Sequence, residues 1–169
     1  MVRWDWIRRT APLAAVLIAG VLCTAPTASS AFTLTSIGPT IGATDPDGVD
    51  GTVMFGGDLN FEQSGSRVHL QPNLLYWSQE GLSDVNPNFD VLYHFEPAGR
   101  VSPYLGAGVG LHFYSEEGPG NPGTDPGANL FAGLLIPYER TTFFVQGRGV
   151  LSDRNQVGIL SGVLFSLGR

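Results

Sequence analysis

The three histidines of the chain, His69, His94 and His112, are the residues that most readily suggest metal chemistry. Three neutral imidazoles can hold a zinc ion when a fold brings them together. These three lie in separate segments and lack the close spacing of a zinc motif. We therefore expect no metal and no other cofactor.

An acidic segment, 45–51, has the composition of a calcium loop. Val49 stands, however, where such a loop needs another oxygen ligand, and no glutamate follows at the closing position. A solvated loop is the better interpretation.

Charged side chains that could form a buried network recur in segments where polar and apolar residues alternate. The candidates are Arg148, Asp58, Glu62 and Asp90, together with His69, His94 and His112. A buried charge must be paired, and arginine suits a carboxylate network because it donates five N–H groups. If these segments enclose one interior, we predict that Arg148 bridges some of Asp58, Asp90 and Glu62. A functional polar pore or ligand site is the alternative.

The elements that must position these residues are strands, because a period of two is the strongest pattern in the chain. In 52–62, for example, Val53, Phe55 and Leu59 share one face, opposite Asp58 and Asn60. The pattern predicts about eight strands: 32–43, 52–62, 67–77, 88–96, 101–114, 129–138, 141–151 and 157–167. Their polar faces also carry Glu96, Gln71, Asn73, Tyr104 and Gln146.

The connections between the predicted strands indicate that the two ends of the structure differ. Those after the second, fourth and sixth strands are short, whereas those after the first, the third and especially the fifth, at 115–127, are longer and rich in Gly, Pro and Asp. Arg67, Arg100, Arg140 and Arg169 fall at the short-turn end, and acids, among them Asp84, fall in the longer loops. Aromatic residues, Trp77 among them, lie near strand ends, where membrane barrels carry two aromatic girdles.

The first 31 residues predict a cleavable signal peptide. Arg3, Arg8 and Arg9 precede an apolar run from Ala11 to Cys23, and Ser29-Ser30-Ala31 offers a cleavage site. Lipidation at Cys23 is an alternative, although Leu22 is larger than the residue that usually precedes a lipidated cysteine. The mature domain, 32–169, would then contain no cysteine.

Composition helps to distinguish a nucleic-acid-binding protein, a soluble β-protein and a membrane barrel. The chain has 9 basic and 15 acidic residues and no lysine, so we expect no nucleic-acid partner. A soluble barrel or sandwich would alternate in the same way, with its apolar face inside. Its solvent face would usually be rich in Lys and Thr, whereas the polar face here is rich in Gly and His. We therefore predict an all-β, up-and-down antiparallel transmembrane β-barrel, exported to the outer membrane of a Gram-negative envelope.

Three segments carry a resemblance to a known family. The segment Ser102-Pro103-Tyr104-Leu105-Gly106-Ala107-Gly108-Val109-Gly110 and the ending Phe143–Arg148 with Gly162–Phe165 resemble the small outer-membrane β-barrels of the outer-membrane protein A, X and W types. That resemblance implies a membrane barrel, and partners that include outer-membrane lipid, lipopolysaccharide and the assembly machinery. Family members commonly end on an aromatic residue, whereas this chain ends on Arg169.

We expect a monomeric, non-enzymatic protein with a structural or surface-interaction role. A narrow channel for small or hydrophobic solutes is one alternative. A lipid A-modifying enzyme is another, but lipid A deacylases of this type place a His and a Ser two apart on one strand face. Here Ser115 follows His112 by three residues, which puts the two on opposite faces. We therefore expect no catalytic residues.

Overall fold

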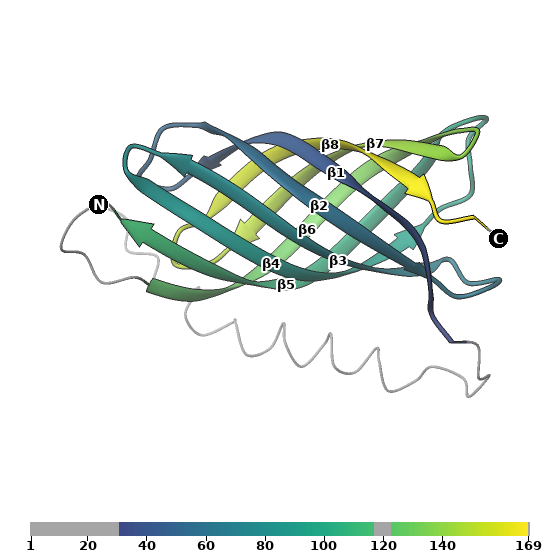
Figure 1. Ribbon diagram of the computed structural model, residues 1–169, viewed down its shortest axis with the longest axis horizontal. Helices are drawn as coiled ribbons and strands as arrows, with labels where there is room; N and C mark the ends of the chain where they lie inside the picture. The colour runs from purple at the N-terminus through teal and green to yellow at the C-terminus, as the bar shows by residue number, and fades with distance from the viewer. Residues whose placement is uncertain (1–30, 117–122, 169) are drawn as a thin grey trace. The chain divides into compact units, whose positions relative to one another are not determined.

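The computed structural model describes residues 31–116 and 123–168, so nearly all of the predicted signal peptide lies outside the described residues. The described chain forms eight strands: β1 (Thr33–Pro46), β2 (Thr52–Glu62), β3 (Val68–Gln79), β4 (Leu82–His94), β5 (Ser102–Glu116), β6 (Gly123–Tyr138), β7 (Thr141–Leu151) and β8 (Gln156–Ser166). Each strand pairs with the next in antiparallel fashion, and β8 pairs with β1, so the sheet closes into a barrel (Figure 1). The predicted fold class is confirmed.

Two predicted connections are shorter than expected. The third was expected to be a long loop through Asp84, but β3 and β4 are joined by Glu80 and Gly81 alone. The fifth was expected to span 115–127, but β5 continues to Glu116 and β6 begins at Gly123, with 117–122 outside the described residues. Both errors have the same cause. The polar and glycine-rich composition of these segments is typical of loops, but in this barrel the segments continue the strands.

The barrel has two distinct ends. At the termini end, β1 begins and β8 ends, with Ser36 paired to Ser166, and the β2–β3, β4–β5 and β6–β7 connections lie there too. The β1–β2, β3–β4 and β7–β8 connections lie at the loop end, and the β1–β2 turn contains two aspartates, Asp47 and Asp50. Because successive strands run in opposite directions and their number is even, the first strand begins and the last strand ends at the same end of the barrel.

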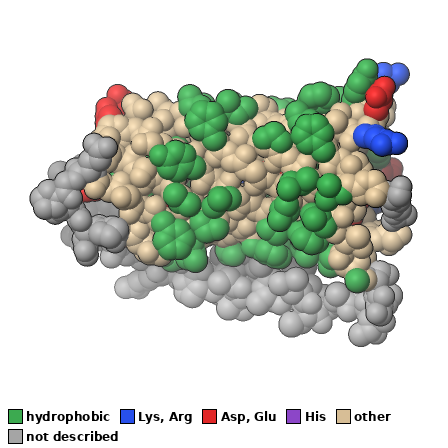
Figure 2. Space-filling view, in the orientation of Figure 1, with side chains coloured by type: hydrophobic (Ala, Val, Ile, Leu, Met, Phe, Trp, Pro, Cys, Tyr) green, Lys and Arg blue, Asp and Glu red, His purple; other side chains and the backbone are tan. Residues whose placement is uncertain are grey.

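The outer face of the barrel is apolar. Large side chains such as Phe55, Phe89, Val109 and Leu130 are about half exposed, at 52%, 48%, 54% and 62%. Figure 2 shows such side chains spread over the side of the barrel, with charged groups gathered at its two ends. On the outer face of the described strands, Asp45 near the loop end is the one charged residue. None of the described residues forms a helix long and apolar enough to cross a membrane.

The interior contains polar side chains between two apolar clusters. Met54, Leu75, Trp77, Leu82, Tyr114 and Leu160 pack together toward the loop end. Leu92, Tyr104 and Phe131 form the second cluster, nearer the termini end. Trp77 was predicted to lie in an outer aromatic girdle, but it points inward and is only 1% exposed. The barrel is thus filled by its own side chains, as an eight-stranded barrel allows.

Glycines on β5 make room for the polar layer. A Cβ at Gly108 would lie 2.6 Å from the Phe89 carbonyl oxygen and would also collide with the Asp90 carboxylate. The neighbouring inward position, Gly110, faces the Asn88 side chain in the same way. The alternating glycines of β5 therefore let large polar groups of β4 cross the interior.

Candidate functional site

An ion pair closes the middle of the interior. Arg148 on β7 donates to both carboxylate oxygens of Asp90 on β4, at 2.8 Å from Nη1 to Oδ2 and 3.3 Å from Nη2 to Oδ1. The two side chains are only 4% and 1% exposed. The Arg148 guanidinium also lies over the Phe131 ring, 5.1 Å from its centroid. A two-point contact of this kind fixes both side chains across the barrel.

Amide side chains complete the bonding of Asp90. Asn73 donates to Oδ2 at 2.7 Å and Asn129 donates to Oδ1 at 3.2 Å. Asn88 connects these two amides, since it donates to Asn73 at 3.0 Å and accepts from Asn129 at 2.8 Å. Four strands, β3, β4, β6 and β7, are therefore joined through one carboxylate.

Asp58 belongs to the same layer but does not bond to Arg148. It accepts from Thr40 on β1 and from Gln71 on β3, the latter at 3.0 Å. Glu62 lies farther toward the termini end, where it accepts from Thr35 and Asn60, both at 2.9 Å. Of the three acids predicted to meet Arg148, the structure thus brings only Asp90 into contact with it.

The histidines do not form one group. His69 and His94 stack near the termini end with ring centroids 3.8 Å apart, and His69 Nδ1 lies 3.8 Å from Glu62 Oε1. His112 lies toward the loop end, so the three-histidine zinc hypothesis does not match the geometry. Among residues 31–116 and 123–168, no cluster of three or more His, Cys, Asp or Glu side chains could hold a metal ion.

Glu96 was predicted to face the interior, and this is wrong. It follows β4 at the termini end, where its side chain is 78% exposed and accepts a 2.6 Å hydrogen bond from Arg67. That bond raises the pKa of the Arg67 guanidinium above its ordinary value. The alternation of β4 ends at His94, which accounts for the error.

A second buried pair was missed from the sequence. Asp84 was placed in an external loop, but it is fully buried on β4, and its Oδ2 lies 2.7 Å from His112 Nδ1 on β5. The His112 ring stacks on Tyr114 at 5.6 Å, and Gln156 lies 3.4 Å from both Asp84 and the Tyr114 hydroxyl. The available signal was the alternation of Asp84, Asn86 and Asn88 with Val85, Pro87 and Phe89.

An Asp–His pair provides two of the three members of a hydrolytic triad, so its third neighbour matters. Ser115 is exposed, whereas His112 is 1% exposed and faces the interior. His112 Nε2, the atom that would take a proton from a nucleophile, has no hydrogen-bond partner among the described residues and lies next to Gly127. The pair and Ser115 are therefore not arranged for acyl transfer.

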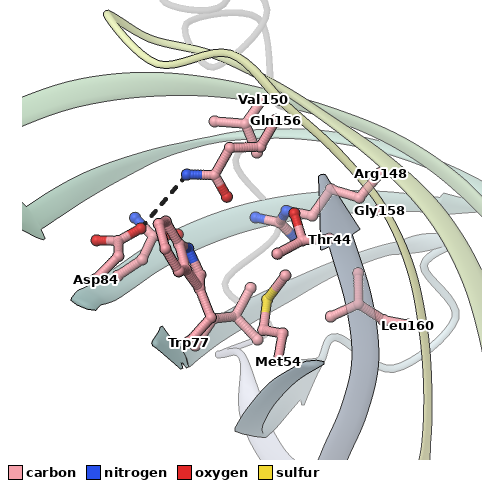
Figure 3. Close-up of a pocket in the computed structure, with 11 residues that line it drawn as sticks. Thr44, Met54, Trp77, Asp84, Arg148, Val150, Gln156, Gly158 and Leu160 are labelled. Carbon is pink, nitrogen blue, oxygen red and sulfur yellow. Dashed lines mark hydrogen bonds between the residues drawn. The ribbon is translucent and has the colours of Figure 1, made fainter. Parts of the chain in front are cut away.

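A small cavity borders this pair toward the middle of the barrel. It measures about 10 Å³ and is lined by Trp77, Asp84, Arg148, Gln156 and Leu160, among others. Figure 3 shows the Arg148 guanidinium and the Gln156 amide extending toward the space beside Trp77. A volume of this size holds about one water molecule, so the cavity is no passage through the barrel.

Comparisons with solved structures agree with this geometry. Neisserial surface protein A superposes with a TM-score of 0.70 at 11% sequence identity, covering 81% of this chain and 99% of that one. The N-terminal β-barrel domain of Pseudomonas aeruginosa OprF superposes with a TM-score of 0.61 at 18% identity, covering 78% and 97%. The fold is that of a small outer-membrane β-barrel.

A third structure belongs to the same group. Ail, the attachment invasion locus protein of Yersinia pestis, superposes with a TM-score of 0.50 at 16% identity, covering 82% of this chain and 99% of that one. No family model and no curated protein sequence matches the chain. At these identities the likeness concerns the fold, and the suspected resemblance to small outer-membrane barrels is confirmed at that level.

Proposed function

We propose that the chain is a non-enzymatic integral protein of the bacterial outer membrane, with a sealed barrel that carries its loop end at the cell surface. The observation that carries this proposal is the combination of an apolar outer face with an interior closed by the Arg148–Asp90 pair. A sealed barrel can anchor and present surface segments without admitting solutes.

The loop end supports a surface-interaction role. Its described connections carry Asp47, Asp50, Glu80 and Asp153, and Arg154 is held 3.6 Å from Glu116. The turns are also tied together, because Asp47 N donates to Asn155 O at 2.8 Å and Asn155 donates to Asp47 Oδ2 at 3.1 Å. This end thus presents an ordered acidic surface. By name, one structural neighbour is a surface protein and another is an attachment invasion locus protein, which supports the proposal.

Site-directed labelling in intact cells tests the orientation and the location. In a Cys23→Ser background, Asp50→Cys in the β1–β2 turn should react with a membrane-impermeant maleimide. The matched variant Ser64→Cys, in the β2–β3 turn at the opposite end, should react only after the cells are broken. Labelling of Ser64→Cys alone in intact cells would contradict the proposed orientation, and labelling of neither would contradict surface exposure.

Conductance tests the sealed interior. The purified chain in planar bilayers should give no stepwise currents under conditions in which a general porin conducts. Regular current steps would favour the alternative function, a narrow channel. Incubation with radiolabelled lipid A should leave the lipid unchanged, and a modified product would support the enzymatic alternative instead.

A further inference from the structure

An open groove lies on the outer wall of the barrel near its loop end. It crosses β1 and the two strands that flank it, β2 and β8 (Figure 1), and measures about 480 Å³. Ala43 on β1 contributes a small side chain to the lining and is paired with Val53 on β2 and Ile159 on β8. Val157 and Ile159 are 69% and 65% exposed, so they stand out from the wall beside Ala43. The groove therefore has apolar sides, and it lies on the face that we place in lipid.

A carboxylate lies at the loop end of this groove. Asp45 follows Ala43 on the outer face of β1, lines the groove and is exposed. It is the one charged residue on the outer face of the described strands. Ionisable side chains that face lipid are rare and by default indicate a functional site. A carboxylate beside an apolar groove matches a ligand that has both a hydrocarbon chain and a positive group.

The surrounding charges restrict the headgroup of such a ligand. Asp47 and Asp50 in the adjacent β1–β2 turn add negative charge, which disfavours an anionic headgroup. A divalent cation could bridge to a lipid phosphate, but no cluster of three or more His, Cys, Asp or Glu side chains among the described residues could hold one. A primary ammonium group carries three N–H donors and can bond to a single carboxylate.

We propose that this groove binds a phospholipid with a primary ammonium headgroup, of the phosphatidylethanolamine type. One acyl chain lies between Val53 and Ile159, and the ammonium group donates to Asp45. A volume of 480 Å³ falls within the range of about 300–1,000 Å³ that small-ligand sites have. The inference rests on the membrane location proposed above and adds a specific lipid partner to it.

Native mass spectrometry of the protein purified in detergent tests the class of lipid. Phosphatidylethanolamine, phosphatidylglycerol and phosphatidylcholine with the same acyl chains are added separately at equal concentration. Phosphatidylethanolamine should stay bound about tenfold more than either of the others, which is the difference that one charged hydrogen bond makes. Equal retention of the three lipids overturns the proposal, and so does displacement of phosphatidylethanolamine by equimolar lipopolysaccharide.

A charge variant tests the position of the headgroup. Asp45→Asn should remove the preference for phosphatidylethanolamine, whereas Asp50→Asn, in the nearby turn, should retain it. A preference that survives Asp45→Asn overturns the assignment of the ammonium group to this carboxylate.

A groove-filling variant tests the position of the acyl chain. Ala43→Phe should abolish lipid retention, and Ala132→Phe, an equal change at an exposed position on the outer face of β6, should preserve it. Retention by Ala43→Phe places the lipid elsewhere and overturns the proposal; if that variant does not fold, Asp45→Asn decides. Surface labelling as expected without any lipid preference would contradict this inference alone and leave the proposed location intact.

Discussion

At the scale of single residues, Arg148 is the one buried arginine in the part of the chain that the structure describes. Asp58, Asp84 and Asp90 are buried together with Arg148, and only Asp90 bonds to it. Asp58 is satisfied by neutral donors, Thr40 and Gln71, and Asp84 by His112. The arginine therefore acts as a specific partner of Asp90 more than as a centre for all acids. Removing it leaves a buried carboxylate with amide donors alone.

Replacing Arg148 should consequently be costly. Arg148→Met is expected to lower the free energy of unfolding by about 3–5 kcal/mol, because it breaks a buried pair from one side. The double variant Arg148→Met, Asp90→Asn should lose less than the single variant, since no unpaired charge remains. Urea unfolding in lipid vesicles measures both. Arg154→Met, at the partly exposed loop end, is the control and should change stability by about 1 kcal/mol or less.

This prediction also distinguishes pairing from simple packing. Equal losses in the single and the double variant would mean that Arg148 stabilises the barrel through its contact with Phe131 and its volume, and that the charge of Asp90 matters little.

At the scale of elements, prediction from sequence succeeded where apolar and polar residues alternate clearly along a segment. The bounds expected for β2 and β7, 52–62 and 141–151, are those of the structure. It failed at the start of β4, where 82–87, with Asp84 and Asn86, was predicted to be loop and the strand to begin at Asn88. Asp, Asn and Gly usually signal turns because they expose polar groups to water. Inside this barrel the same groups bond to one another, so they extend a strand.

The candidate site was predictable to a similar degree. That Arg148 and Asp90 both face the interior follows from alternation alone, because facing depends only on the parity of each strand. Which acid Arg148 contacts depends on strand register, and no local signal encodes it. Asp90 on β4 pairs with Gln71 on β3 and Gly108 on β5, whereas Arg148 lies on β7, which is not a neighbour of β4 in the sheet. The interior role of Trp77 was missed because aromatic residues near strand ends also suit a membrane interface.

The glycine row of β5 gives a prediction for an element. Gly108→Ala should destabilise the barrel by about 1–3 kcal/mol, because its Cβ would collide with backbone atoms of Phe89 and Asp90. Gly147→Ala is the matched control, since no atom lies within 4 Å of a Cβ there. It should change stability by about 0.5 kcal/mol or stabilise slightly. Comparable losses in both variants would indicate an intrinsic strand effect of glycine instead of a steric one.

The β3–β4 turn gives another prediction at this scale. Glu80 has a φ of 53° and Gly81 a φ of 77°, the left-handed pair of a two-residue hairpin turn. Asn tolerates this conformation better than Glu, so Glu80→Asn should raise the free energy of unfolding by up to about 1 kcal/mol. Gln79→Asn, one residue earlier within β3, should give no such gain. A loss of stability at position 80 would show that the Glu80 side chain contributes an interaction that outweighs the strain.

At the scale of the whole molecule, the two faces of the sheet have reversed roles compared with a soluble barrel. Apolar side chains cover the outside, and the central interior is polar and charged. The apolar clusters at either side of the ion pair make the interior nonetheless a packed core. This combination requires an apolar solvent around the barrel, because in water nothing would offset the cost of exposing so large an apolar outer face.

A charge placed on the outer face tests that requirement. Val109 lies midway along β5, points outward and is 54% exposed, so Val109→Arg introduces no clash. In a bilayer the buried guanidinium should cost about 2–4 kcal/mol at mid-depth. Ser115→Arg, on the same face of β5 near the loop end, should cost about 0–1 kcal/mol. Unfolding in vesicles and heat-dependent gel mobility report both. Equal stability of Val109→Arg and the parent chain would contradict insertion of this face in lipid, because a solvated surface accepts arginine at either depth.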